Sequence, residues 1–235
     1  MSLSTMAIVT GGSRGIGLAI ARAIVKEGGR VMITGLDGAR VERAVLALDA
    51  PGRTAGRVCD VRDRGGVEEL VAATIREFGG LNTLVNNAGV GAFANVAVMT
   101  DADWHRVIDT NLTGAFYCSR AALPALRASS GGWIINIASL AGRNYFAGAG
   151  AYCASKAGLV AFTEALMLEV RTENIRVSCV MPGSVATEFS GPTDRNSDDS
   201  WKLSADDVAE VVIDLLRHPG RSLPSKVEIR PAKTK

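Results

Sequence analysis

Tyr152 and Lys156 stand four residues apart in a segment whose composition is typical of a helix. Residues at this spacing share one helical face, with Cβ atoms about 5–6 Å apart. A phenol titrates near pKa ~10, so it exchanges protons poorly at neutral pH unless a nearby positive charge favours the phenolate. The spacing therefore predicts a proton-transfer pair in which Lys156 activates Tyr152. From these two residues alone, an aromatic side chain packed on the core beside a solvated lysine is the alternative.

A glycine-rich turn near the N-terminus follows a short apolar run and opens an amphipathic stretch. Gly11, Gly15 and Gly17 have the spacing G-x-x-x-G-x-G. Glycines let a backbone bend sharply and approach a ligand closely, and amides at the start of a helix attract phosphate groups. The spacing differs from G-x-G-x-x-G, but strand, turn and helix follow in the same order. We therefore expect the turn to bind a dinucleotide, with a plain tight turn as the alternative.

The end of the second apolar run indicates which dinucleotide to expect. A carboxylate there would bind the ribose hydroxyls of NAD(H) and repel the 2′-phosphate of NADP(H). The position holds Gly35, and Arg14 lies in the preceding turn, where it can accommodate a phosphate. NADP(H) is therefore favoured over NAD(H), although Asp37, two residues further on, leaves NAD(H) open.

The composition is that of one globular domain. With 235 residues, of which 47% are hydrophobic, the chain can bury roughly 70–75% of its unfolded surface. Lys and Arg total 26 against 24 Asp and Glu, without a dense basic cluster, so nucleic acid is not an expected partner. The cysteines and histidines lack the spacing of a metal site, so none is expected. No leader and no run of about 18 apolar residues is apparent, so we expect a soluble, cytoplasmic protein without a membrane contact.

Short β-branched runs alternate with longer amphipathic stretches, which predicts βαβ units and a parallel sheet. Right-handed crossovers would place helices on both faces of this sheet. The fold class is therefore α/β: a single-domain Rossmann fold over residues 1–235, with a doubly wound parallel sheet of about seven strands. The strands are expected near residues 6–10, 30–34, 55–59, 82–86, 132–138, 175–181 and 226–230. The helices are expected near residues 15–28, 38–49, 63–79, 101–128, 150–171 and 205–217.

Helix starts and one long loop complete this organisation. Thr100 and Ser204 are expected to cap the helices that follow them, because early carboxylates accompany both. Residues 188–203 are polar and break the alternation, with Phe189 and Trp201 among their few large apolar side chains. Loops of this length are usually lids, binding loops or disordered segments, and we predict a substrate lid here.

Five motifs in a fixed order make the chain resemble the short-chain dehydrogenase/reductase family, in its standard-length branch. They are the turn at 10–17, the Asn-Asn-Ala-Gly run at 86–89, Ser139, the pair Tyr152 and Lys156, and Pro182-Gly183 followed by Thr187. The resemblance covers nearly the whole chain. It implies an NAD(P)(H)-dependent oxidoreductase that transfers hydride between nicotinamide and a small or medium carbonyl or secondary alcohol.

The resemblance also implies a catalytic set. Tyr152 would donate the proton, and Ser139 would hydrogen-bond the same substrate oxygen. Lys156 would lower the pKa of the tyrosine and hold the nicotinamide ribose. The backbone carbonyl of Asn111, a helix-distorting residue, would hold a water of the proton relay. Activation of Ser139 as an acyl-enzyme nucleophile is not expected, since no histidine and acid pair accompanies it.

Cofactor contacts follow from the same resemblance. Asp60 would hydrogen-bond the adenine, and Asn87 would brace the cofactor pocket. Taken alone, each has a structural alternative, Asp60 as a turn residue and Asn87 as the end of a strand. The residues expected to contact the cofactor are Gly11, Ser13, Arg14, Gly15, Ile16, Gly17, Gly35, Asp60, Val61, Asn87, Ala88, Gly89, Tyr152, Lys156, Pro182, Gly183, Val185 and Thr187.

Two other functions stay open. A 3-oxoacyl-thioester reductase is one, although residues 223–231 differ from the valine-aspartate-glycine-glycine ending of the typical 3-oxoacyl-carrier-protein reductases. A cofactor-sensing protein without turnover is the other, since a fold alone does not establish activity. The resemblance further implies a homo-oligomer, a dimer or a homotetramer, paired through the helices near 101–128 and 150–171. The alternative for the second of these helices is a single buried core helix.

Overall fold

A computed structural model describes residues 4–129, 131–187, 189 and 199–233 of the chain. Its sheet has seven parallel strands in the order β3-β2-β1-β4-β5-β6-β7. All seven predicted strands are present, with small shifts at their ends. They are β1 (Met6–Val9), β2 (Arg30–Gly35), β3 (Thr54–Val58), β4 (Thr83–Asn86), β5 (Gly132–Ile137), β6 (Ile175–Pro182) and β7 (Lys226–Ile229).

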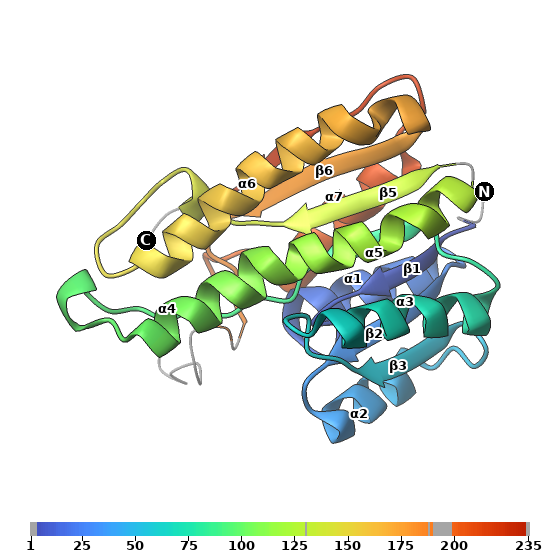
Figure 1. Cartoon of the computed structure of the whole chain (residues 1–235), viewed down its shortest axis with the longest axis horizontal. Coiled ribbons are helices and arrows are strands. Elements are labelled where there is room, and N and C mark those ends of the chain that lie inside the picture. Colours follow the sequence, from blue (N-terminus) through green and yellow to red (C-terminus); the bar gives the residue numbers. More distant parts are fainter. Residues whose placement is uncertain (1–3, 130, 188, 190–198, 234–235) are drawn as a thin grey trace.

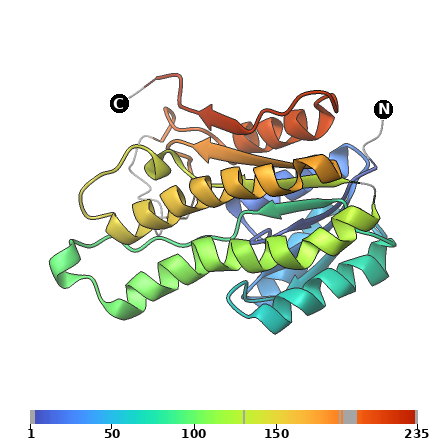
Figure 2. The same cartoon turned by 45° about the horizontal axis from the view of Figure 1, so that its top comes forward.

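Helices cover both faces of the sheet, so the prediction of a doubly wound, single-domain Rossmann fold is confirmed. On one face, α3 (Arg64–Phe78), α5 (Gly114–Ala128) and α6 (Gly150–Val170) lie side by side, as Figures 1 and 2 show. On the other face lie α1 (Gly15–Lys26), α2 (Gly38–Leu48) and α7 (Ala205–Arg217). Among the helices of the described segments, none is long and apolar enough to pass through a membrane.

The central strands are buried on both faces, as a parallel sheet between two helix layers requires. Every residue of β4 is buried, and in β5 and β6 only Gly132 and Arg176 are partly exposed. The cysteines contribute to this packing as buried, free thiols: Cys59, Cys118, Cys153 and Cys179. The carboxyl ends of the strands are thereby held at one edge of a rigid sheet.

The sheet changes direction between β1 and β4, which pair with each other. From β1 the chain continues outward through β2 and β3, whereas from β4 it continues the other way through β5, β6 and β7. Ligands of open parallel sheets bind beyond the carboxyl ends of the strands at such a switch point. The glycine turn follows β1 and the 86–89 loop follows β4, so both motifs lie there.

The predicted helix caps are present. The Thr100 hydroxyl accepts a hydrogen bond from Asp103 N at 3.1 Å, at the start of α4 (Asp101–Ile108). The Ser204 hydroxyl accepts one from Asp207 N at 3.1 Å, at the start of α7. Each cap satisfies an amide that has no partner within its own helix.

The predicted helix over residues 101–128 is present, and it is distorted at Asn111, as the resemblance implied. A π-helical turn, η2 (Asp109–Thr113), separates α4 from α5. A π-turn accommodates one extra residue and re-aims the side chains around it, and such turns often occur at functional sites. Asn111 lies at the centre of this turn and is fully buried. The π-helical turn therefore sets the direction of the Asn111 side chain.

Candidate functional site

A cleft of about 1190 Å³ opens at the carboxyl ends of the strands. Its walls come from the turn after β1, the loop after β4, the start of α6 and the segment after β6. Pockets for one drug-sized ligand usually have about 300–1,000 Å³, so this cleft has room for a dinucleotide together with a small substrate.

All but two of the predicted site residues line this cleft. Gly17 and Asn111 lie directly behind its wall, in α1 and in η2. The lining residues that the sequence predicted are Gly11, Ser13, Arg14, Gly15, Ile16, Gly35, Asp60, Val61, Asn87, Ala88, Gly89, Ser139, Tyr152, Lys156, Pro182, Gly183, Val185 and Thr187. Motifs that are up to about 170 residues apart in the sequence are thus brought together, as the strand order of a doubly wound sheet requires.

The glycine turn is held by the loop after β4. Asn87 Nδ2 donates to Thr10 O at 2.9 Å and to Gly11 O at 3.1 Å. Gly11 has a φ of 61°, a left-handed conformation that favours glycine. A Cβ at Gly17 would lie 2.4 Å from Gly11 O and 2.5 Å from Asn87 Nδ2. Gly17 is therefore needed so that α1 can start directly beneath the turn.

Gly15 leaves open the space that a diphosphate would fill. Its φ is 53°, and a Cβ there would lie 3.6 Å from Thr187 Cγ2 on the opposite wall. In the described chain no side chain caps the start of α1 at Arg14, so the first amides of the helix face a ligand without competition. The residues present thus fit the phosphates of a dinucleotide.

At the predicted adenosine end, Gly35, Asp37 and Arg40 line the cleft at and just beyond the end of β2. A Cβ at Gly35 would lie 2.8 Å from Ser13 Oγ, so a larger residue would collide with the turn. The Asp37 carboxylate caps α2 by accepting from Arg40 N at 3.0 Å, and it lies 3.8 Å from Arg40 Nε. Arg40 also lines the cleft, and sequence reasoning missed it. The feature that could have identified Arg40 is its position in the sequence, five residues beyond the end of β2.

Asp60 lies at the same end and is engaged by Arg62. The Arg62 guanidinium donates to both carboxylate oxygens of Asp60, with Nη2 at 2.6 Å from Oδ2. This hydrogen bond lowers the pKa of the Asp60 carboxyl, against the opposing effect of burial. The carboxylate is therefore ionised and held in place at neutral pH.

Lys156 is buried beneath Tyr152. Its Nζ donates to Ile137 O at 2.9 Å and lies 5.8 Å from the centroid of the Tyr152 ring. Burial lowers the pKa of the Lys156 ammonium to about 8. An ammonium without a carboxylate beside it is poorly stabilised when water is excluded, which is the cause of this shift.

The Ser139 side chain is close enough to the Tyr152 hydroxyl to affect its pKa by hydrogen bonding, and Ser139 Oγ accepts from Ala141 N at 3.1 Å. Burial raises the pKa of the Tyr152 phenol, and the bond with Ser139 lowers it to a smaller extent. The net direction is opposite to the one expected from Lys156. The reason is geometric, since the Lys156 ammonium donates to Ile137 O from below the ring.

Asn111 connects the loop after β4 to α6. Its Oδ1 accepts from Val90 N at 2.8 Å, and its Nδ2 donates to Val90 O at 2.9 Å and to Ser155 Oγ at 2.9 Å. Ser155 Oγ in turn donates to Tyr152 O at 2.8 Å. Sequence reasoning missed Ser155, although its place directly before Lys156 puts it on the inner side of the helix. The chain of bonds fixes Tyr152 relative to the loop.

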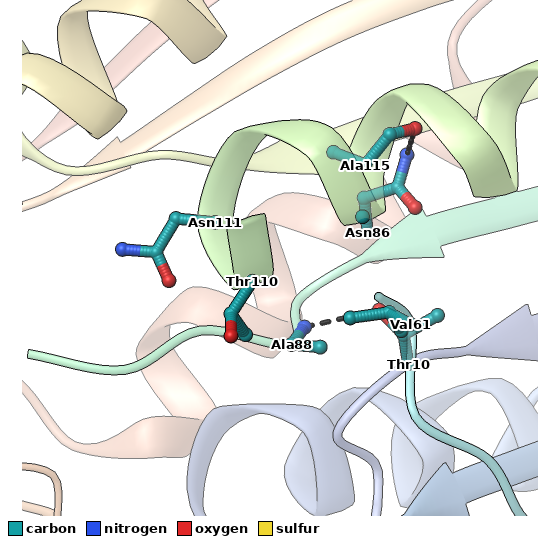
Figure 3. A pocket seen from close by; sticks show the side chains of 8 residues that line it. Thr10, Val61, Asn86, Ala88, Thr110, Asn111 and Ala115 are labelled. Carbon is teal, nitrogen blue, oxygen red and sulfur yellow. Dashed lines mark hydrogen bonds between the residues drawn. The ribbon is translucent and has the colours of Figure 1, made fainter. Parts of the chain in front are cut away.

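A small pocket adjoins the cleft where η2 meets the two loops (Figure 3). Thr10 Oγ1 accepts from Asn87 N and Ala88 N, both at 3.0 Å, and the second of these bonds is drawn in Figure 3. The pocket has no room for a water molecule. It is therefore a packing contact that holds the turn, the loop and η2 together, and it is not a ligand site.

The predicted lid lies largely outside the described residues, at 188 and 190–198. Its two ends are paired: Ala186 N donates to Leu203 O at 2.8 Å, and Leu203 N donates to Ser184 O at 2.9 Å. Phe189 and Trp201 line the cleft. The described residues on either side of the gap therefore lie at the cleft.

Comparisons with known proteins agree with this geometry. A family model described as short chain dehydrogenase matches residues 5–198. The chain is 39% identical over 187 residues to a rabbit protein (Oryctolagus cuniculus) named dehydrogenase/reductase SDR family member 4, covering 79% of this chain and 72% of the relative. It is 37% identical over 216 residues to a 3-oxoacyl-acyl-carrier-protein reductase of Chlamydia pneumoniae, covering 88% and 87%.

The fold also resembles that of a solved structure. A metagenomic short-chain oxidoreductase in complex with NADP superposes with a TM-score of 0.86 at 35% sequence identity. The match covers 100% of both chains. The likeness of the fold therefore extends over the whole chain.

Proposed function

The chain belongs to the short-chain dehydrogenase family, which makes it a nicotinamide-dependent oxidoreductase, and we propose that it reduces small or medium carbonyl compounds with NADPH. The observation that carries this proposal is the shared cleft. Tyr152 and Ser139 line the same cleft as the glycine turn. A proton donor and a dinucleotide site in one cleft are what carbonyl reduction requires.

Each member of the catalytic set has a role that its geometry supports. As the substrate C=O bond is reduced, its carbon gains a hydride and its oxygen gains the Tyr152 proton. Nicotinamide, when bound, supplies that hydride. Ser139 hydrogen-bonds the substrate oxygen and so orients it. Lys156 supports the nicotinamide ribose from below Tyr152, and Asn111 positions the loop and α6 through its side chain.

The pKa of Tyr152 supports reduction as the working direction. Because burial raises this pKa, the phenol keeps its proton at neutral pH and can donate it to a developing alkoxide. Oxidation of an alcohol needs the phenolate as a base. We therefore expect oxidation to require a higher pH than reduction.

A preference for NADP(H) is supported by the charges at the adenosine end. Gly35 occupies the position where a ribose-binding carboxylate would stand, and Arg14 and Arg40 line the cleft beside it. The Asp37 carboxylate already caps α2, which draws it away from a ribose. We expect kcat/KM with NADPH to exceed that with NADH at least about tenfold, the worth of one charge-assisted contact.

The experiment is a carbonyl panel assayed separately with NADPH and NADH, on the parent and on two tyrosine variants. Tyr152→Phe removes one hydroxyl, and we expect kcat to fall about 10²–10⁴-fold, the usual contribution of a general acid. Tyr145→Phe is the matched control, because Tyr145 is exposed and does not line the cleft. NADPH binding, followed by fluorescence, should stay within a few fold in both. Substantial turnover by Tyr152→Phe would show that another group donates the proton.

A second candidate substrate is a 3-oxoacyl thioester, because the relative from Chlamydia pneumoniae carries that activity in its name. An acetoacetyl thioester belongs in the panel for this reason. Reduction of the thioester in preference to simple ketones would favour this candidate. Tight NADPH binding without turnover of any panel member would instead support a cofactor-sensing protein.

We also propose that the chain forms a homo-oligomer through α5 and α6. Phe116 on α5 and Leu168 on α6 are 40% and 58% exposed on the same helical layer. Exposed apolar side chains on neighbouring helices are typical of a twofold interface. Light scattering at micromolar concentration should give a dimer or a tetramer, and a monomer would contradict the proposal.

A further inference from the structure

Aromatic rings surround Tyr152 at the substrate end of the cleft. The ring centroids of Phe93 and Phe189 lie 5.7 Å and 5.6 Å from that of Tyr152. Phe146 stacks on Phe93 with a centroid distance of 6.4 Å and an interplanar angle of 24°. All three phenylalanines line the cleft, and we call Phe93, Phe146 and Phe189 the aromatic wall.

The aromatic wall is unusually exposed for phenylalanine. The exposed fractions are 50% for Phe93, 54% for Phe146 and 39% for Phe189. The chain has six phenylalanines, so half of them stand at this one place. Phenylalanine gains free energy by leaving water, and exposed apolar patches inside a cleft mark a ligand surface. A bound apolar group would cover these rings.

Gly91 gives the wall its shape. A Cβ at Gly91 would lie 2.8 Å from Phe93 Cε2 and 3.2 Å from Phe189 Cε1. Both rings therefore rest against the main chain of the loop after β4, next to the proton donor. Aromatic pairs prefer offset or edge-on arrangements with centroids about 4.5–7 Å apart, which a planar ring of a ligand can join beside these side chains.

Among the described residues, the cations that line the substrate end of the cleft already have partners. Lys156 is buried and donates to Ile137 O. Three further cations outside the adenosine end line the cleft, and in the described chain each contacts a carboxylate: Arg106 with Asp103, Lys202 with Asp199, and Arg230 with Glu228. A substrate carboxylate or sulfonate would have to compete with these carboxylates for the cations.

We infer that the substrate carries a flat, uncharged aromatic group next to its carbonyl, as in an aryl ketone or an aryl aldehyde. This inference rests on the proposed carbonyl reduction. The ring of the substrate packs between the aromatic wall and the nicotinamide site, and this places its carbonyl oxygen at the Tyr152 and Ser139 hydroxyls. Phe93 is the residue that determines this specificity, because it contacts Tyr152, Phe146 and the Gly91 main chain together.

The test compares three ketones of similar size with NADPH: acetophenone, cyclohexyl methyl ketone and 4-acetylbenzoate. The aryl ketone has a planar ring, the second ketone has a saturated ring, and the third adds a negative charge to the aryl ketone. We expect kcat/KM for acetophenone to exceed the values for both others about tenfold or more, the discrimination of a well-fitted apolar pocket. These ratios compare substrates on one protein, so they do not depend on the active fraction.

Phe93→Leu then removes the planar ring and keeps an apolar side chain. We expect the preference for acetophenone over cyclohexyl methyl ketone to fall about tenfold or to vanish. Tyr145→Leu is the matched control, since it also exchanges an exposed aromatic residue for leucine but lies outside the cleft lining. Its ratio should equal that of the parent. Because Phe93 is half exposed, the variant should unfold at the same urea concentration as the parent.

The outcomes distinguish a failure of this inference from a failure of the proposed carbonyl reduction on which it rests. If no carbonyl in the panel is reduced with either cofactor, the proposed function fails and the substrate class fails with it. If carbonyls are reduced but the saturated or anionic ketone matches acetophenone, the function stands and the aromatic specificity is overturned. The same conclusion follows if Phe93→Leu leaves the parent's ratio unchanged.

Discussion

The two halves of the cleft are built in different ways. In the cofactor half, main-chain atoms form the surface, and Asn87 holds the carbonyls of Thr10 and Gly11 in place. In the substrate half, the aromatic wall consists of side chains from three separate loops. The shape of a main-chain surface can change only if the backbone moves. A surface made of side chains can change through single substitutions. The cofactor half should therefore resist substitution, and the substrate half should tolerate it.

A matched pair of glycine substitutions tests this contrast with the largest expected effect. In Gly17→Ala, the new Cβ would lie 2.4 Å from Gly11 O, so the main chain must move. We expect a loss of about 1–3 kcal/mol in the free energy of unfolding. The Kd for NADPH should also rise, because the displaced turn fits the cofactor less well. We expect a rise of at least about tenfold, which corresponds to a loss of about 1.4 kcal/mol in binding free energy.

Gly91→Ala is the partner of that variant in the substrate half. Its Cβ would meet the Phe93 and Phe189 rings, which can rotate away. We expect its stability to change by less than about 1 kcal/mol and its NADPH affinity to stay within about twofold, while the KM for the carbonyl changes. Urea denaturation and fluorescence titration measure these quantities. Equal losses of NADPH affinity in both variants would remove the distinction between the halves.

The same contrast explains how far the sequence could lead. Gly11, Gly15 and Gly17 stand where the main chain can accept only glycine, so the cofactor half could be predicted. The succession of strands along the chain could be predicted from the alternating apolar and amphipathic stretches. The aromatic wall has no fixed spacing, and Phe93 was missed because a lone phenylalanine in a loop is also typical of ordinary packing. The distortion at Asn111 followed from the resemblance and not from the apolar pattern, because one inserted residue hardly disturbs the periodicity of the long segment.

A second test concerns Asn111, which lies where the cofactor half and the substrate half of the cleft meet. In Asn111→Ala, the N–H and C=O of Val90 lose their partners inside the protein, and Ser155 Oγ loses a donor. Leaving such buried groups unpaired reduces the free energy of unfolding by about 1–3 kcal/mol. We also expect kcat to fall, since the loop and α6 are no longer tied together. Urea denaturation and steady-state kinetics on the same samples measure both effects.

Asn144→Ala is the control for that variant. Asn144 also lines the cleft, but its side chain is exposed. Its removal should change the free energy of unfolding by no more than about 0.5 kcal/mol. If Asn111→Ala were as mild as Asn144→Ala, the bonds to Val90 would not be what joins the halves.

The smallest expected effect is a pH dependence of stability at Lys156, which lies where the halves meet. A Cβ on Gly89, in the cofactor half, would lie 3.6 Å from its Nζ, and the Tyr152 ring lies on its other side. In the folded chain burial lowers its pKa from 10.5 to about 8. Between these values the unfolded chain holds a proton that the folded chain has released. The free energy of unfolding therefore rises with pH, by about 1 kcal/mol at pH ~9 relative to pH ~7.

Lys156→Met isolates this contribution, because methionine has a similar shape and no proton to release. Cys59, Cys118 and Cys179, whose pKa values burial raises, are present in both proteins, so their contributions largely cancel in the difference between them. We expect the parent to gain about 1 kcal/mol on the variant between pH ~7 and pH ~9 in urea denaturation. A constant difference would mean that Lys156 keeps its proton throughout this range. In that case main-chain groups of the cofactor half would stabilise the ammonium, and Lys156 would be part of the cofactor half alone.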